Sequence, residues 1–361
     1  MSAFDRDDLA QVAEDLVRIP SVSGNEAEAS RWLVEALGDR GFRSHVDGAG
    51  NAVASIGEGE QTIALVGHVD TVPGDLPVHV TDGVLHGRGA VDAKGPLVAL
   101  AAAARRAVDR GADARFVVVG CVEEEAPSSK GARHLRATWK SPPAALVIGE
   151  PSRWNGVTLG YKGILSCRAR FERDSAHGAH DAESSAEAAC AWWTDVRDDA
   201  RAFAPEDAPL FDRVLPRLLG MRSAHDGITD ATTVDVALRL PESLPPDAAL
   251  AWLSERCPGT RVERIGAAPA WRGPRTSPIA RALGRSILAA GARPRFQVKT
   301  GTADLNLLAP AWGCPAVAYG PGDAALDHTP EERIALDELE QGAEVLAHAL
   351  AAYRLTVVPT G

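Results

Sequence analysis

The sequence predicts an α/β fold, with a sheet that is at least partly parallel, interrupted by a smaller α+β domain. Three observations lead to this prediction. Short apolar segments alternate with alanine-rich segments over about the first 150 residues, as strands alternate with helices in α/β proteins. Between residues 159 and 271 the segments become longer and more alternating, and after residue 272 the first pattern resumes.

The elements of the first region follow in chain order. The N-terminal segment is acidic and amphipathic, which indicates the first helix of the fold rather than a signal peptide. The segment 95–111 is alanine-rich and ends at a glycine, so it predicts a helix, and 132–140 predicts another. Strands are expected over the remaining apolar runs, 61–70, 114–125 and 144–152.

The middle region predicts a small α+β unit of about 110 residues. Its segments alternate between strand-like and helix-like patterns. Strands are expected over 156–173, 232–241 and 260–271, and helices over 182–203 and 245–257. The chain then returns to the first pattern, with a helix at 277–291, a strand and turn at 315–322 and a long terminal helix at 335–355.

The composition limits the class of protein. The chain has 361 residues and a formal net charge of −11, which argues against a general nucleic-acid-binding surface. It contains no run of about 18 apolar residues, so no membrane-spanning helix is predicted. The five cysteines are scattered without a C-x-x-C pair, which favours reduced thiols and a cytoplasmic location.

Acidic and imidazole side chains follow the ends of successive predicted strands. In open α/β sheets, ligands bind outside the carboxyl ends of the strands, so we expect these side chains at one edge. They are His68, Asp70, Asp92, Glu123, Glu124, Glu125, Glu150 and His328. Histidine with carboxylates and without cysteine is a ligand set for a Lewis-acid cation such as zinc. Each feature alone is common on protein surfaces, but together and in this order they favour a metal site.

Two of these features have a local geometric reason. His68 and Asp70 are two residues apart on a predicted strand and so point to the same face. A carboxylate close to a ligating imidazole can fix its tautomer without binding the metal itself. Asp92 follows a glycine-containing turn, which permits the backbone conformation needed to aim one side chain inward.

Five segments carry a resemblance to a known family: GHVDTVPG, GRGAVDAKGP, VEEEAPSSKG, VIGEPS and DHTPEE. In this order they resemble the motifs of the di-zinc aminoacylase and carboxypeptidase superfamily, which includes acetylornithine deacetylase and succinyl-diaminopimelate desuccinylase. The resemblance implies a zinc-peptidase-like catalytic domain with a mixed sheet, residues 1–158 plus 272–361. It also implies an inserted lid and dimerisation domain with a βαββαβ pattern, residues 159–271, and hence a homodimer.

The resemblance also implies roles for the site residues. Asp70 would orient His68, and Glu124 would be the general base. Two divalent metal ions, zinc or alternatively cobalt, would share Asp92 as a bridging ligand. His68 and Glu150 would complete one metal site, and Glu125 and His328 would complete the other.

The glutamate triplet allows two registers. The family pattern has a base followed directly by a ligand, then a turn and a glycine. The spacing to Gly131 favours Glu124 and Glu125, whereas pairing Glu123 with Glu124 lengthens the loop by one residue. Because adjacent residues on an extended chain point to opposite sides, both can reach one pocket only if the chain turns there, and APSS supplies such a turn. Glu123 would then be a flanking residue, stabilised by a neighbouring cation or by water.

The remaining candidates concern substrate binding. In the family a lid histidine, supplied across the dimer, assists at the reacting carbonyl, and here His177 or alternatively His180 fits, with His177 favoured. The segment 300–304 resembles the one that holds the substrate's α-carboxylate. The candidate residues in this segment are Thr300, Gly301 and Thr302. Arg239, on a predicted lid strand, is a further candidate, with an exposed salt bridge as the alternative role of its guanidinium.

The segments GYKG (160–163) and VKTGTADLN (298–306) are most similar to the lysine-biosynthesis branch of the superfamily. This similarity implies a metal-dependent hydrolase that releases lysine, or ornithine, from the γ-carboxyl of a glutamate on an amino-group carrier protein. The alternative is a small-molecule deacylase acting on acetylornithine or acetyl-lysine. A third hypothesis, a metal-free binding protein on the same fold, would require lost ligands, whereas every expected ligand type is present.

Overall fold

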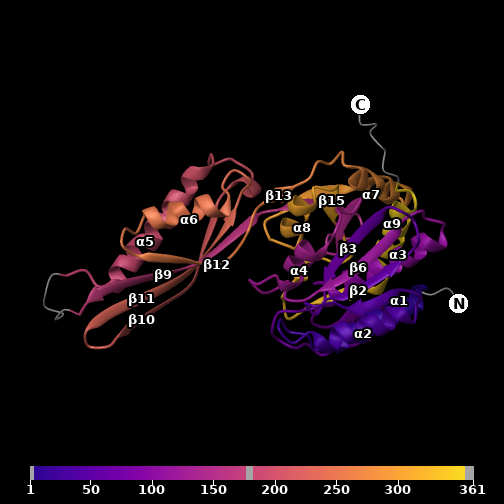
Figure 1. The fold of residues 1–361 in the computed structure, drawn as a ribbon, viewed down its shortest axis with the longest axis horizontal. Coiled ribbons are helices and arrows are strands. Elements are labelled where there is room, and N and C mark those ends of the chain that lie inside the picture. Colours follow the sequence, from indigo (N-terminus) through magenta and orange to yellow (C-terminus); the bar gives the residue numbers. More distant parts are fainter. Residues whose placement is uncertain (1–3, 176–181, 354–361) are drawn as a thin grey trace. The chain divides into compact units, whose positions relative to one another are not determined.

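The structure, a computed structural model, describes residues 4–175 and 182–353 and divides into two compact units (Figure 1). The first unit comprises Met1–Gly160, Arg272–Val298 and Ala303–Gly361, and the second comprises Tyr161–Trp271 with Lys299–Thr302. The short segment 299–302 therefore groups with the second unit, whereas the sequence predicted that it belongs with the catalytic domain. No helix in the described ranges is long and apolar enough to cross a membrane.

The first unit is built on a mixed sheet with the strand order β1-β2-β6-β3-β7-β15-β8. Its central pairs, β3 with β6, β3 with β7 and β7 with β15, are parallel, and the pairs toward both edges are antiparallel. The prediction of a partly parallel, mixed sheet is confirmed. The strands are β1 (Arg43–Val46), β2 (Ala52–Ile56), β3 (Thr62–His68), β6 (Arg115–Cys121), β7 (Ala145–Ile148), β8 (Gly156–Tyr161) and β15 (Ala316–Ala318), and β14 (Arg295–Lys299) also pairs with β8.

Helix α3 packs closely against this sheet and against α9, as Figure 1 shows. Glycines at two strand ends permit the close approach of α3, because a Cβ at Gly120 would lie 3.0 Å from Leu97 and one at Gly149 would lie 2.8 Å from Leu100. The helices of this unit are α1 (Arg6–Arg18), α2 (Ala27–Gly38), α3 (Lys94–Asp109), α4 (Lys130–Thr138), α7 (Pro278–Ala289), α8 (Leu305–Trp312) and α9 (Leu336–Ala351).

A small antiparallel sheet adds to the first unit, in the order β16-β5-β4. Its strands are β4 (His79–Thr81), β5 (Val84–His86) and β16 (Arg333–Ala335). The register pairs Arg333 with His86. The sheet thus joins the segment that follows His328 to the loop that leads to Asp92.

The second unit has the element order β9, α5, β10, β11, α6, β12, which is a βαββαβ pattern. Its antiparallel sheet has the order β10-β11-β9-β12, and α5 and α6 bury Trp192 and Leu253 in one core against it. The side chain of Ser184 caps the first turn of α5 in a capping box with Glu187. The bounds are β9 (Gly163–Asp174), α5 (Ser185–Asp199), β10 (Leu215–His225), β11 (Thr229–Leu240), α6 (Pro246–Glu255) and β12 (Arg261–Ala268). Two 3₁₀ turns, Ala200–Phe203 and Leu210–Asp212, connect α5 to β10, and the pair Trp271–Arg272 forms β13.

Candidate metal centre

The carboxyl ends of three parallel strands bring the predicted site residues to one edge of the first unit's sheet. β3 lies between β6 and β7 and ends at His68, which is in register with Cys121 at the end of β6. Glu150 follows β7 after one glycine. His68 and Glu150 are 1% and 8% exposed. The sheet topology therefore places these side chains together in a largely buried position.

Asp92 lies between two imidazoles and presents one carboxylate oxygen to each. Its Oδ1 is 3.1 Å from His68 Nε2, and its Oδ2 is 3.1 Å from His328 Nε2. His68 Nε2 also lies 3.8 Å from Glu150 Oε1, and His328 Nε2 lies 2.7 Å from Glu125 Oε1. Among the described residues, two groups of three possible metal ligands contain Asp92: one with His68 and Glu150, the other with Glu125 and His328. A third group joins His68 to Glu124 and Glu125.

These distances suit metal binding. In each group one ligand atom per residue lies within 4.8 Å of the others. Two ligands held at about 2.0–2.2 Å from zinc with tetrahedral geometry are roughly 3.3–3.6 Å apart. The observed separations lie on both sides of this range, so small side-chain movements would suffice. Imidazole and carboxylate are also the donors that zinc and similar cations accept.

Asp70 holds the glutamate turn that follows β6. Its Oδ1 accepts the backbone N–H of Glu124 and its Oδ2 accepts that of Glu125, both at 3.0 Å, and the Ser23 hydroxyl donates to Oδ2 at 2.7 Å. The turn begins at Glu123, whose φ of +56° lies in the left-handed region. The chain therefore turns already at Glu123, before the pair, whereas the sequence assigned the turn to the APSS segment after it, and Glu124 and Glu125 both lie in a group with His68.

Glu123 points to a different environment. Its carboxylate accepts a hydrogen bond from Ser128 Oγ at 2.6 Å and lies 3.4 Å from the Lys130 ammonium. Gly131 donates its N–H to the carbonyl of Val122 at 3.0 Å and closes the loop behind the triplet. A Cβ at Gly131 would lie 2.7 Å from Val122 N, which explains why the loop ends on glycine. This geometry supports the register with Glu124 and Glu125 as the inward pair.

Glu123→Gln is expected to retain bound metal and to change kcat/KM by less than about 3-fold. Surface substitutions usually change the free energy of unfolding by less than about 0.5 kcal/mol, so the site should keep its geometry. The glutamine can still accept the hydrogen bond from Ser128, and the lost ion pair with Lys130 is a partly exposed one. Steady-state kinetics and a metal assay of the purified variant test this. Loss of metal or of turnover would favour the other register.

His68 is oriented mainly by a backbone carbonyl. Its Nδ1 lies 2.9 Å from the carbonyl oxygen of Asp70 and 3.4 Å from Asp70 Oδ1. The Nδ1–H therefore donates to the backbone oxygen, which leaves Nε2 free to face Asp92. The sequence predicted that the Asp70 carboxylate orients His68. In the structure this carboxylate also holds the turn that carries Glu124 and Glu125.

Burial and crowding shift the titration of these groups. Burial raises the pKa of Glu124 well above its usual value, with Glu150, Asp304 and Glu125 adding to the effect. For Asp92, burial acts in the same direction, but hydrogen bonds from His328 and His68 outweigh it and lower the pKa. Glu124 is thus a carboxyl group with a raised proton affinity, which is the property of a general base that works near neutral pH.

In the metal-free protein, His328 is expected to stabilise the fold only at lower pH. The carboxylates of Asp92 and Glu125 raise the pKa of its imidazole from the usual 6.5 to about 10. Because the folded state binds this proton more tightly than the unfolded chain, the stabilisation is complete below pH 6.5 and is lost as the pH rises through about 10. The thermal midpoint should fall over this range, as measured by calorimetry. His328→Gln should fall less steeply, and equal slopes would contradict the assignment.

The predicted substrate-binding residues lie in the second unit. Arg239 donates to Thr302 Oγ1 at 2.7 Å, and the Thr302 hydroxyl donates to the carbonyl of Lys162 at 3.0 Å. Thr300 and Gly301 belong to the same segment, Lys299–Thr302. The two lid histidines of the sequence prediction, His177 and His180, lie outside the described residues.

Sequence reasoning missed several residues that support the site. Glu26, which is 5% exposed, accepts the N–H groups of Gly24 and Glu123 at 2.7 and 3.2 Å. Asp304 is 3% exposed, and burial raises the pKa of its carboxyl to about 7. Ser23 bonds to Asp70, 47 residues away in the chain, and Glu26 bonds to Glu123, 97 residues away. No local sequence motif predicts such long-range contacts. Asp304 does belong to the segment 300–304, which the sequence analysis had identified as a candidate for substrate binding.

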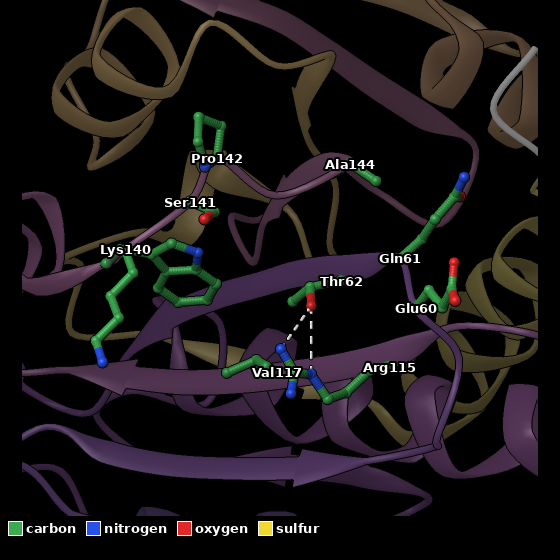
Figure 2. A pocket seen from close by; sticks show the side chains of 10 residues that line it. Glu60, Gln61, Thr62, Arg115, Val117, Lys140, Ser141, Pro142 and Ala144 are labelled. Atoms are coloured by element: carbon green, nitrogen blue, oxygen red, sulfur yellow. Dashed lines mark hydrogen bonds between the residues drawn. The ribbon is translucent and has the colours of Figure 1, made fainter. Parts of the chain in front are cut away.

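A separate cavity of about 620 Å³ lies where β3 and β6 begin, at the strand ends opposite to His68 and Cys121. Figure 2 shows Arg115 directed toward Thr62. The Thr62 hydroxyl accepts hydrogen bonds from Nε and Nη2 of Arg115 at 3.2 and 2.9 Å. Its lining also includes Glu60, Trp139 and Lys140. None of the predicted metal ligands lines this cavity.

Comparisons with known proteins place the chain in a family. A family model described as Peptidase family M20/M25/M40 matches residues 64–352. A protein of Deinococcus radiodurans named "[LysW]-lysine hydrolase" is 46% identical over 352 residues, which cover 94% of this chain and 97% of the relative. A protein of Thermococcus kodakarensis named "Putative [LysW]-lysine/[LysW]-ornithine hydrolase" is 38% identical, with 93% and 89% covered.

A solved structure agrees with this assignment at the level of the fold. An M20 family metallo-carboxypeptidase from Sulfolobus solfataricus superposes with a TM-score of 0.81 at 17% identity, covering 96% of this chain and 99% of that one. The chain therefore belongs to peptidase family M20/M25/M40. The predicted superfamily and the predicted class of enzyme, a metallopeptidase-type hydrolase, are confirmed.

Proposed function

We propose that the chain is a two-metal amide hydrolase that releases lysine, or ornithine, from the γ-carboxyl of a glutamate on an amino-group carrier protein. The position of Asp92 between His68 and His328 supports the two-metal chemistry. The relative from Deinococcus radiodurans, 46% identical along nearly the whole chain, supports the carrier-linked substrate. A role in the biosynthesis of lysine or arginine follows from that product.

The residues divide the work as follows. Two divalent cations, zinc or cobalt, held by the two ligand groups would polarise the scissile carbonyl and lower the pKa of the attacking water. Glu124 would take a proton from that water and deliver it to the leaving amine, a contribution of typically about 10²–10⁴-fold. Asp70 would keep Glu124 and Glu125 at the site through their backbone N–H groups.

Substrate binding is assigned to the second unit. The guanidinium of Arg239 and the segment Thr300–Thr302 would bind the α-carboxylate of the released amino acid, since they offer charged and hydroxyl donors. His177 would donate a hydrogen bond to the oxygen of the reacting carbonyl.

We also propose that the chain forms a homodimer through the second unit. Leu219 on the edge strand β10 and Ile228 in the turn that follows it are 57% and 78% exposed, which supports an interface there. The mass in solution, from light scattering, tests this part of the proposal.

A side-by-side assay decides the substrate. Acetylornithine, acetyl-lysine, carrier-linked lysine and carrier-linked ornithine are offered to the same zinc-loaded preparation, and kcat/KM is compared. The proposal expects the carrier-linked substrates to be preferred. Preference for acetyl-lysine or acetylornithine would instead establish a small-molecule deacylase. The net charge of −11 favours this alternative, because it indicates no basic surface for an acidic carrier. No hydrolysis in the presence of zinc or cobalt would overturn both.

A further inference from the structure

Glu332 is a buried carboxylate in the loop between His328 and β16. The residue is 1% exposed, and its side chain has no exposed surface. It does not face the two imidazoles of the candidate metal centre. Its partners all belong to the loop between β5 and α3, the loop that carries Asp92. A fully buried carboxylate needs such partners, because burying a charge without them costs several kcal/mol.

The contacts of this carboxylate converge from one short segment. Oε1 accepts the backbone N–H groups of Gly89, Val91 and Asp92 at 2.9, 3.1 and 3.1 Å. Oε2 accepts a hydrogen bond from Arg88 Nη1 at 2.7 Å. Three N–H groups directed at one oxygen form a concave anion-binding arrangement, here filled by a side chain of the same protein.

The backbone of Glu332 holds the start of the same loop. Its carbonyl accepts the N–H of Gly87 at 3.2 Å, next to the pairing of Arg333 with His86 between β16 and β5. The loop 87–92 is therefore fixed at its first residue by the main chain of Glu332 and at its last by the side chain. A φ of +88° at Gly89 lets the loop curve around the carboxylate.

We propose that Glu332 is a positioning residue for the metal centre: it fixes the backbone of Asp92 so that one oxygen of the Asp92 carboxylate faces His68 and the other faces His328. This inference rests on the proposed two-metal function. Because Glu332 lies only four residues after His328, the same connection also sets the His328 loop relative to Asp92. Both ligand groups should then depend on a residue that touches neither imidazole.

The test uses Glu332→Gln and Glu332→Ala, with Glu340→Gln as the matched control. Glu340 accepts two hydrogen bonds from Arg106, at 2.9 and 2.7 Å, and joins α9 to α3 away from the Asp92 loop. Three quantities are measured for each full-length protein: the zinc dissociation constant by competition with a chelator, the visible absorption spectrum of the cobalt form, and the thermal midpoint without metal.

Glu332→Ala is expected to raise the zinc dissociation constant about 10–100-fold and to change the cobalt spectrum, the size typical for residues that orient metal ligands. Glu332→Gln should show a smaller loss, because its amide oxygen can still accept the three N–H bonds. Glu340→Gln should lower the thermal midpoint and leave the zinc affinity and the cobalt spectrum unchanged.

One result would overturn the inference. If the Glu332 variants lose thermal stability as the control does but keep the zinc affinity and cobalt spectrum of the unmodified protein, Glu332 has only a structural role. If Glu332→Ala does not fold, the same criterion applies to Glu332→Gln. A failure of the proposed function is distinguishable, because the unmodified protein would then bind no zinc before any variant is compared.

Discussion

Glu124→Gln is expected to lower kcat by about 10²–10⁴-fold while the protein keeps its bound metal. Glutamine has nearly the same volume and keeps an oxygen at the site, so packing and metal binding should survive. It cannot accept a proton from water, which is the task assigned to Glu124. Its place in one group with His68, with its backbone held by Asp70, is the structural basis for the assignment, and burial raises the pKa of its carboxyl. Steady-state kinetics with the preferred substrate and metal content by atomic emission measure the two effects separately.

Glu123→Gln is the matched control for this experiment, because it makes the same chemical change one residue earlier on the same turn. The Glu123 carboxylate is bound by Ser128 and Lys130 instead of facing the imidazoles. A variant Glu124→Gln with near-normal kcat would show that another group is the base. A variant that loses metal would show that Glu124 acts chiefly as a ligand.

The position of the candidate metal ligands at one sheet edge could be predicted, because it depends on short sequence patterns. A buried apolar strand followed by a polar side chain can be recognised in the sequence, and parallel pairing of β3, β6 and β7 brings such strand ends together. His68 and Glu150 are placed in this way, each directly at or after a strand end. The sequence could not supply the order of the strands, but any order that kept them adjacent and parallel would give the same edge.

Elements without a clear apolar pattern were missed. β10 is an edge strand whose residues are half-buried or exposed, so its sequence shows no regular alternation. α8 contains Pro310 inside the helix, a residue that normally argues against one. The single long strand expected over 156–173 is two strands, β8 and β9, divided at Lys162, whose N–H bonds to Lys299 instead of continuing one ladder.

The supporting contacts of the site were also invisible in the sequence, for a physical reason. Asp70, Glu26 and Glu332 all accept hydrogen bonds from backbone N–H groups of loops far away in the chain. A backbone donor is offered by every residue except proline, so the partner leaves no mark on the sequence. Which carboxylate contacts which loop depends on the whole fold, whereas metal ligands can be recognised in the sequence by their residue type.

Asp92→Ala is expected to have the largest effect of any single substitution, with turnover reduced at least about 10⁴-fold. The carboxylate belongs both to the ligand group with His68 and Glu150 and to the group with Glu125 and His328, so its removal should weaken both metals together. The rate would then lose the Lewis-acid contribution of several kcal/mol and the proton transfer by Glu124, which needs an activated water. Kinetics and the number of metal ions per chain are the measurements.

The comparison that makes this result informative is with His68→Ala and His328→Ala. Each removes a ligand from one Asp92 group only and should leave the other partly occupied, whereas Asp92→Ala should leave neither. Zinc at about 100 times its dissociation constant stabilises a protein by about 2.7 kcal/mol per site, so the rise in thermal midpoint on adding zinc reports the sites that remain. This rise should be absent in Asp92→Ala and reduced in the two histidine variants. A full equivalent of zinc retained by Asp92→Ala would mean that the two ligand groups act independently and that Asp92 does not join them.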